Sequence, residues 1–160
     1  SFDATSEEEA LAWAEKIPDA TGGTIELRPL RSAVTPTSAP DKAGKKEYLL
    51  LVYEAESRWA TLGESEAKAI FARYNDFSSA LKQAGQFVAG GQLDGVQKAK
   101  SLTVKAGERV VRDGPFAETR EQLGGYYRVL ARDLDEAIAL AAKIPAAETG
   151  TIEVRPLMKM

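Results

Sequence analysis

The residues best suited to chemistry in this sequence are Asp113 and Tyr74. Asp113 stands before Gly114 and Pro115, where its carboxylate can either point into a cavity or cap the turn that follows. Tyr74 falls on the apolar side of a predicted helix, where its hydroxyl can either line a cavity or be satisfied within the core. We take both as candidate catalytic residues and leave both alternatives open.

Candidate ligand contacts lie on a polar turn and on paired glycines. Arg120 could clamp an anionic substrate or pair with a neighbouring carboxylate, although a solvated surface turn is the simpler explanation. The glycines suggest a phosphate-binding loop. However, no glycine-rich loop in this sequence follows a strand and precedes a helix, so β-bulges and turns explain these glycines more simply. The candidate ligand contacts are Gly90, Gly91, Phe116, Glu118 and Arg120.

Composition removes several kinds of site. The 160 residues include no cysteine and no histidine, which excludes disulfides, thiolate sites, the usual metal ligand and the usual base of neutral pH. We therefore expect no metal and no cofactor. Glu54 and Asp76 are further carboxylates, but no spacing marks any carboxylate pair as a general acid and base.

Charge and hydropathy bear on partners. The formal net charge is −3 with acidic and basic residues interleaved, so there is no basic stripe for nucleic acid. The longest apolar runs, such as residues 49–53, have the length of a strand and are too short to span a membrane. We expect a cytoplasmic protein that binds neither nucleic acid nor membrane.

Residues 1–30 repeat residues 128–157. Aligned without a gap, about half of the positions match, and both copies predict a helix that stops at a proline, a glycine-containing turn and an alternating strand. Each copy opens with a helix-start pair: Ser6 with Glu9, and Asp133 with Glu136.

A helix and one strand cannot bury a core alone, so residues 1–30 must dock on something. Three arrangements are open. The strand of this segment can pair with a sheet edge, within the chain or across a dimer. The segment can instead displace its duplicate, residues 133–157, in a swapped arrangement, or it can be the tail of an upstream domain. Residues 31–46, rich in Pro, Ser, Thr, Ala and Lys, predict a flexible linker that permits exchange between subunits.

Residues 47–160 predict one α+β domain. A strand over residues 48–53 has the unbroken apolar run of a central strand buried on both faces. Thr61 with Glu64 predicts a capping box before a long helix that ends at Gly85. The apolar face of that helix comprises Ile70, Tyr74, Phe77, Leu81 and Ala84.

The second half of this domain adds shorter elements. A strand over residues 87–91 is followed by a hairpin, residues 102–104 and 109–111, and by a tight turn with a polar helical turn over residues 118–122. A strand over residues 125–130 then leads into the second copy of the repeat. This order predicts a ferredoxin-like βαββαβ sheet with an inserted hairpin and with both helices on one face.

Four stretches resemble the bacterial DGPF proteins of the YCII-related family: residues 48–53, 89–93, 113–126 and 152–157. The resemblance implies a homodimeric α+β barrel, in which two sheets pack face to face around a cavity. Shorter relatives carry a His and Asp pair proposed to act as acid and base. An alignment anchored on Gly85 places Tyr74 where that histidine would be, so histidine chemistry does not carry over.

Two classes of function follow. The first is a protein that binds or converts a small molecule in a cavity at the dimeric barrel, lined by Tyr74 and Asp113. The alternative is a non-catalytic dimeric module with a regulatory or interaction role. The fold alone does not separate them.

Overall fold

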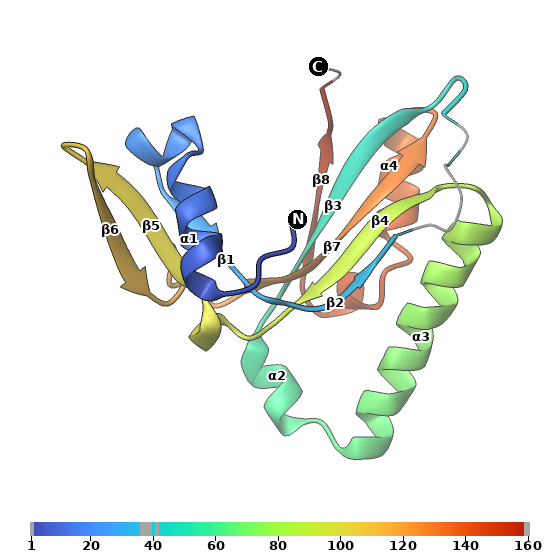
Figure 1. Ribbon diagram of the computed structural model, residues 1–160. Helices are drawn as coiled ribbons and strands as arrows, with labels where there is room; N and C mark the ends of the chain where they lie inside the picture. Colours follow the sequence, from blue (N-terminus) through green and yellow to red (C-terminus); the bar gives the residue numbers. More distant parts are fainter. Residues whose placement is uncertain (1, 36–39, 41, 159–160) are drawn as a thin grey trace. The chain divides into compact units, whose positions relative to one another are not determined.

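The computed structural model describes residues 2–35, 40 and 42–158. The chain divides into two compact units, coloured along the sequence in Figure 1. The main unit comprises residues 30–93 and 120–160, and the hairpin unit comprises residues 1–29 and 94–119.

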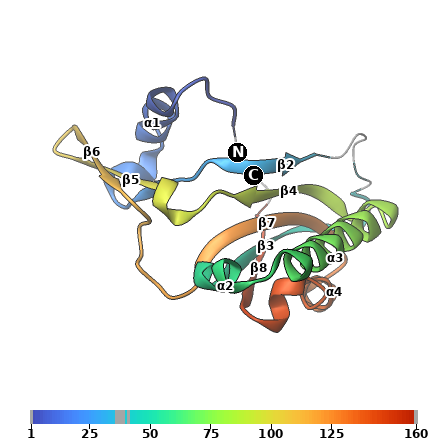
Figure 2. The ribbon, with the colours of Figure 1, turned by 90° about the horizontal axis from the view of Figure 1, so that it is seen from below.

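The main unit is built on a five-stranded antiparallel sheet in the order β2-β4-β7-β3-β8. Its strands are β2 (Leu30–Val34), β3 (Lys46–Glu54), β4 (Phe87–Leu93), β7 (Gln122–Ala131) and β8 (Thr151–Pro156). Its helices are α2 (Glu56–Thr61), α3 (Glu64–Gln83), α4 (Leu134–Ala141) and the 3-10 turn η3 (Pro145–Glu148). The predicted α+β class and βαββαβ order are confirmed, and α3 and α4 lie on the same face of the sheet (Figure 2).

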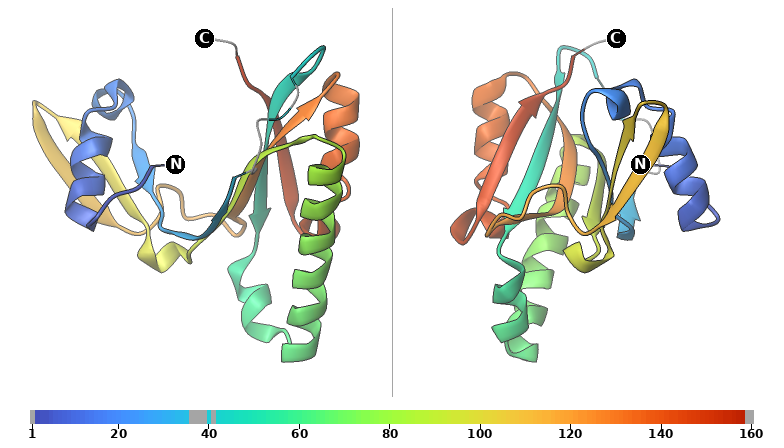
Figure 3. Two further views of the ribbon diagram at one scale, coloured as in Figure 1. Left: turned by 45° about the vertical axis from the view of Figure 1, so that its right-hand side comes forward. Right: turned by 90° about the vertical axis from the view of Figure 1, so that its left-hand side faces the viewer.

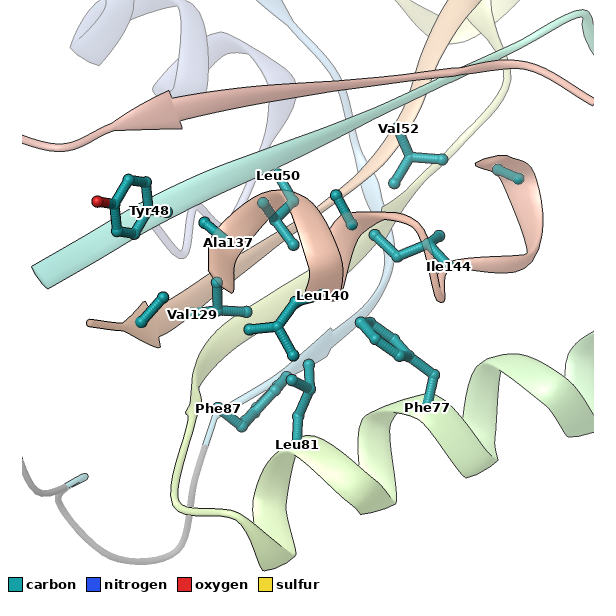
Figure 4. Packing of buried hydrophobic residues seen from close by; sticks show 13 residues of the cluster. Tyr48, Leu50, Val52, Phe77, Leu81, Phe87, Val129, Ala137, Leu140 and Ile144 are labelled. Carbon is teal, nitrogen blue, oxygen red and sulfur yellow. The ribbon is translucent and has the colours of Figure 1, made fainter. Parts of the chain in front are cut away.

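The core of the main unit lies between this sheet and the two helices. Phe77 and Leu81 of α3 and Leu140 of α4 point toward Leu50 and Val129 of the central strands (Figure 4). The spacing of three and four residues along α3 brings its apolar side chains to one face, as predicted, because that period follows the turn of an α-helix. Burial of these side chains removes apolar surface from water and provides the main stabilisation.

The ends of α3 differ in how well the sequence predicts them. Gly85 terminates the helix as expected: its φ is +63°, and the Gln86 N–H donates to the Leu81 carbonyl at 2.9 Å. The predicted capping box of Thr61 with Glu64 is wrong. Thr61 ends α2, where its hydroxyl donates to the Arg58 carbonyl at 2.8 Å, and the N-cap of α3 is a glycine without a side-chain hydrogen bond.

Burial alternates along β3, so this strand is not buried on both faces as predicted. Leu50 and Val52 are buried under the helices, whereas Leu49, Leu51 and Tyr53 on the opposite face are half-buried. We call that opposite side of the main sheet the open face. Tyr126 of β7 pairs with Leu51 and therefore lies on the open face too.

The hairpin unit contains α1 (Glu7–Glu15), η1 (Pro18–Thr21), β1 (Ile25–Leu27), η2 (Val96–Lys98), β5 (Lys100–Lys105) and β6 (Glu108–Asp113). Strands β5 and β6 form the predicted hairpin through Ala106 and Gly107, both at positive φ, as a tight two-residue loop requires. Strand β1 pairs with β5, and α1 packs on both (Figure 3). In this structure α1 and β1 thus pack on the hairpin of the same chain, and exchange between subunits stays a prediction.

Two segments depart from expectation. Residues 31–34 of the predicted linker belong to β2, because the backbone of β4 supplies partners that need no apolar pattern; residues 36–39 and 41 of that linker lie outside the described residues. The predicted polar helical turn over residues 118–122 is wrong. These residues contain no helix, and Gln122 opens β7 by pairing with Glu54.

In the part of the chain that the structure describes, no helix has both the length and the apolar character needed to cross a membrane.

Candidate functional site

Tyr74 lies on the face of α3 that covers the main sheet. Its hydroxyl donates to Oε2 of Glu54 at 3.4 Å. The phenol therefore points beneath the helices and away from the open face, where a barrel between two sheets would have its cavity. The helix of Tyr74 and Glu54 both lie on the side of the sheet that the helices cover. Tyr74 would therefore not line a cavity between two open faces, contrary to the prediction.

Glu54 is the last residue of β3 and is only 8% exposed. Besides the phenol, two donors reach its Oε1: Nη1 of Arg58 at 3.4 Å and Oγ1 of Thr149 at 3.4 Å. Arg58 comes from α2, which starts two residues after the strand ends, and Thr149 follows η3. We call Glu54, Arg58, Tyr74 and Thr149 the Glu54 cluster.

The backbone turn after Thr149 holds the cluster together. A Cβ added to Gly150 would lie 2.2 Å from the Tyr53 carbonyl oxygen and 3.1 Å from Cγ of Glu54. Only glycine therefore fits where this turn crosses the end of β3. The local sequence thus sets how closely Thr149 approaches the carboxylate.

Burial raises the pKa of the Tyr74 phenol well above its ordinary value, and the nearby Glu54 carboxylate raises it further. A backbone hydrogen bond with Ala146 opposes this in part. Tyr74 is therefore a protonated hydrogen-bond donor throughout the neutral range. The pKa of Tyr127, whose hydroxyl lies 3.4 Å from Ser78 Oγ, is raised by burial as well.

An ion pair stands at the rim of the cluster. The guanidinium of Arg73 contacts the carboxylate of Glu148 in bidentate fashion, with Nη1 at 3.0 Å from Oε2. The pair joins α3 to η3, next to Tyr74 and Thr149 in sequence. Hydrogen bonding to Arg73 lowers the pKa of Glu148, and both side chains are exposed.

Asp113 belongs to the hairpin unit, whereas Tyr74 belongs to the main unit. Its carboxylate accepts from Nζ of Lys100 at 2.6 Å, its side chain is 87% exposed, and the lysine lowers its pKa. The turn that follows is held by Ser101, whose hydroxyl donates to the Gly114 carbonyl at 2.9 Å. In this structure Asp113 is neither a turn cap nor a buried acid.

The other predicted ligand contacts are exposed or used in packing. Phe116 is 67% exposed, and its N–H donates to Oε2 of Glu26 at 3.0 Å; Glu118 and Arg120 are exposed. A Cβ on Gly90 or Gly91 would meet the rings of Tyr127 and Tyr126 at 3.3 Å and 3.0 Å. The close approach predicted at these glycines is therefore made by the chain's own tyrosines.

The contact between Glu54 and Tyr74 was not predicted from the sequence. The sequence did contain a sign of this contact. Side chains alternate along β3, so Glu54 lies on the same buried side as Leu50 and Val52, and a buried carboxylate needs hydrogen-bond donors. Arg58 and Thr149 carried no such signal, because their approach depends on α2 and on the turn after η3.

The Glu54 cluster combines a carboxylate, a protonated phenol and a guanidinium within one small volume. A carboxylate can accept a proton from a substrate, and a phenol or guanidinium can donate hydrogen bonds to an oxygen that gains negative charge. Among the residues described by the structure, no three acidic side chains gather in a way that could hold a metal ion.

A family model of the YCII-related domain matches residues 46–160. The chain therefore belongs to the YCII-related family. An uncharacterised protein of Rhizobium meliloti (strain 1021) is 36% identical over 112 residues, a stretch that covers 69% of this chain and 90% of that relative.

Proposed function

We propose that this YCII-related protein is a homodimer that binds or converts a small molecule at the Glu54 cluster. One observation carries the proposal: a carboxylate that is 8% exposed is faced by a phenol, a guanidinium and a hydroxyl, each 3.4 Å away. These contacts are long for hydrogen bonds, so a ligand atom can compete for them at modest cost.

The donors of the cluster define the chemistry of the ligand. The Glu54 carboxylate accepts from an O–H, N–H or acidic C–H group, while Tyr74 and Arg58 donate to a carbonyl or carboxylate oxygen. The Arg58 side chain is 30% exposed, so part of it faces water. A small hydroxy or oxo acid would satisfy all three groups together.

In a reaction, Glu54 would remove a proton beside the carbonyl of such an acid. Tyr74 and Arg58 would stabilise the enolate oxygen that forms, and the same carboxyl group would return the proton to a neighbouring atom. This sequence of steps is proton transfer without an external reductant or oxidant. The raised pKa of Tyr74 keeps its phenol a donor rather than a competing base.

The proposed dimer joins two ferredoxin-like sheets through their open faces as an α+β barrel. Leu49, Leu51 and Tyr126 are half-buried on that face in the single chain, and a second sheet would cover them. The Glu54 cluster lies on the other side of each sheet, so each subunit of the proposed dimer would hold one complete site.

One observation favours the alternative of a non-catalytic dimeric module. The three donors around Glu54 all come from the chain itself, and such a cluster can simply satisfy a buried carboxylate at the end of a strand. The alternative predicts no ligand at the cluster and effects of substitution on stability alone.

A thermal-shift screen with small hydroxy and oxo acids separates the two. We expect at least one acid to raise the melting temperature of the wild type but not of Glu54→Gln, which keeps the shape of the side chain and loses its charge. Glu64→Gln, at an exposed pair with Lys68, is the matched control and should respond like the wild type. Equal responses from Glu54→Gln and the wild type would contradict the proposal.

A further inference from the structure

The ion pair of Arg73 and Glu148 is attached to two members of the Glu54 cluster. Arg73 directly precedes Tyr74 on α3. Glu148 is the last residue of η3 and directly precedes Thr149. The hydroxyls of Tyr74 and Thr149 each reach the Glu54 carboxylate at 3.4 Å. The backbone segments that position these two donors therefore also position the ion pair.

The Glu148 carboxylate lies in the field of two guanidinium groups. Its pKa is lowered first by the hydrogen bond and the charge of Arg73, and the charge of Arg58 lowers it further. Arg58 in turn reaches Oε1 of Glu54 with its Nη1 at 3.4 Å. Four side chains thus alternate in charge from the buried carboxylate to the exposed pair: Glu54, Arg58, Glu148 and Arg73.

The ion pair contributes little to folding. The side chains of Arg73 and Glu148 are 50% and 62% exposed, so water and salt compete with their attraction. The segment that carries Glu148 is held instead by Ile144 and Ala146, which are buried in the core of the main unit. A carboxylate from solution can therefore replace Glu148 on the guanidinium while the main unit stays folded.

We infer that Arg73 binds the carboxylate group of the ligand, and that Glu148 occupies this place until the ligand displaces it. The inference rests on the proposed function, because it assigns the acid group of the small hydroxy or oxo acid. A guanidinium binds the carboxylates of side chains and of free acids in the same bidentate geometry. Arg73 contacts Glu148 in that geometry, with Nη1 at 3.0 Å from Oε2, so Glu148 is the chain's own substitute for the ligand.

Glycolate and glycolamide are a matched pair of probes for this subsite. They share a hydroxyl group and a carbon skeleton, but only glycolate carries a negative charge. Their affinities can be measured from the backbone amide shifts of isotope-labelled protein at low ionic strength, because salt screens exposed guanidinium groups. The melting temperature of each variant verifies that it is folded.

Glu148→Gln removes the internal carboxylate and should tighten glycolate binding about fivefold. Arg73→Gln should weaken it about fivefold, because the bidentate contact is lost. Arg73→Lys keeps the positive charge without the planar fork, so its affinity should fall between those of Arg73→Gln and the wild type. Glycolamide should bind all variants alike. Glu64→Gln, which breaks an exposed pair with Lys68 on the same helix, is the control and should match the wild type.

The outcomes separate this inference from the proposed function. Equal glycolate affinities for the wild type, Glu148→Gln and Arg73→Gln would overturn the inference, and the proposed function would stand if Glu54→Gln still weakened binding. If Glu148→Gln tightens binding while Glu54→Gln leaves it unchanged, the inference stands and the proposed function fails. Absence of glycolate binding to Glu148→Gln, or a gain that glycolamide shares, would also overturn the inference.

Discussion

The carboxylate of Glu54 and the phenol of Tyr74 meet at 3.4 Å, although the two residues are 20 positions apart in sequence and α2 lies between them. The contact forms because β3 ends directly under α3, with Glu54 in the buried phase of the strand. A buried carboxylate and a buried phenol are costly to desolvate, so each depends on the other. The contact therefore links the stability of the main unit to its candidate chemistry.

Tyr74 should titrate later than an ordinary tyrosine. An unfolded tyrosine loses its proton near pH 10, whereas burial raises the pKa of Tyr74 in the folded state. The contribution of this difference to stability is complete below the ordinary pKa and is lost as the pH rises toward the folded one. We expect the melting temperature of the wild type to fall more steeply above about pH 10 than that of Tyr74→Phe. Parallel curves would show that Tyr74 is not shielded.

Glu54→Leu should destabilise the chain by about 1–3 kcal/mol, because Arg58 and Tyr74 would lose a buried acceptor. Glu54→Gln keeps an amide oxygen in the same place and should cost less. Urea denaturation of both variants measures the difference. If Glu54→Leu were as stable as the wild type, the three contacts would contribute nothing to folding.

Gly150→Ala should disturb the end of β3, because its Cβ would lie 2.2 Å from the Tyr53 carbonyl oxygen. The backbone must shift, at a cost of about 1–3 kcal/mol. Gly124→Ala is the control, since a Cβ there lies 3.9 Å from the nearest atom. Chemical denaturation should show a large loss for the first variant and little change for the second; equal losses would mean that the turn is not tightly packed.

Leu51→Lys should dissociate the proposed dimer, because it places a charge on the open face. Sedimentation velocity at micromolar concentration should report a dimer for the wild type and a monomer for the variant. Val111→Lys, an exposed position in the hairpin, should leave the dimer intact. A wild type that sediments as a monomer would remove the barrel from the proposal.

Helix caps and helix ends were predictable from the sequence where the interacting groups lie within one turn of each other. Ser6 and Asp133 cap their helices as expected, because the donor lies three residues away. Gly85 ends α3 for an equally local reason. The helix face containing Phe77 and Leu81 follows from its period.

Features that depend on distant partners were not predictable. Thr61 could cap α3 only if α2 did not already use it, and the sequence does not reveal α2 in advance. Asp113 stands where an aspartate often caps a turn, yet its carboxylate instead accepts a hydrogen bond from Lys100 on the neighbouring strand. Tyr74 stays a candidate, and its contact with Glu54 could not be predicted because it depends on how α3 crosses the end of β3.

The most direct test of the central claim is a crystal structure of the protein after incubation with the small-molecule fraction of a bacterial extract. The Glu54 cluster should then hold density within hydrogen-bond distance of the Glu54 carboxylate and the Tyr74 hydroxyl, with Arg58 turned toward the bound oxygen atoms. Arg58, Tyr74 and Thr149 closed tightly on Glu54, without any bound density, would contradict the account and favour the non-catalytic module.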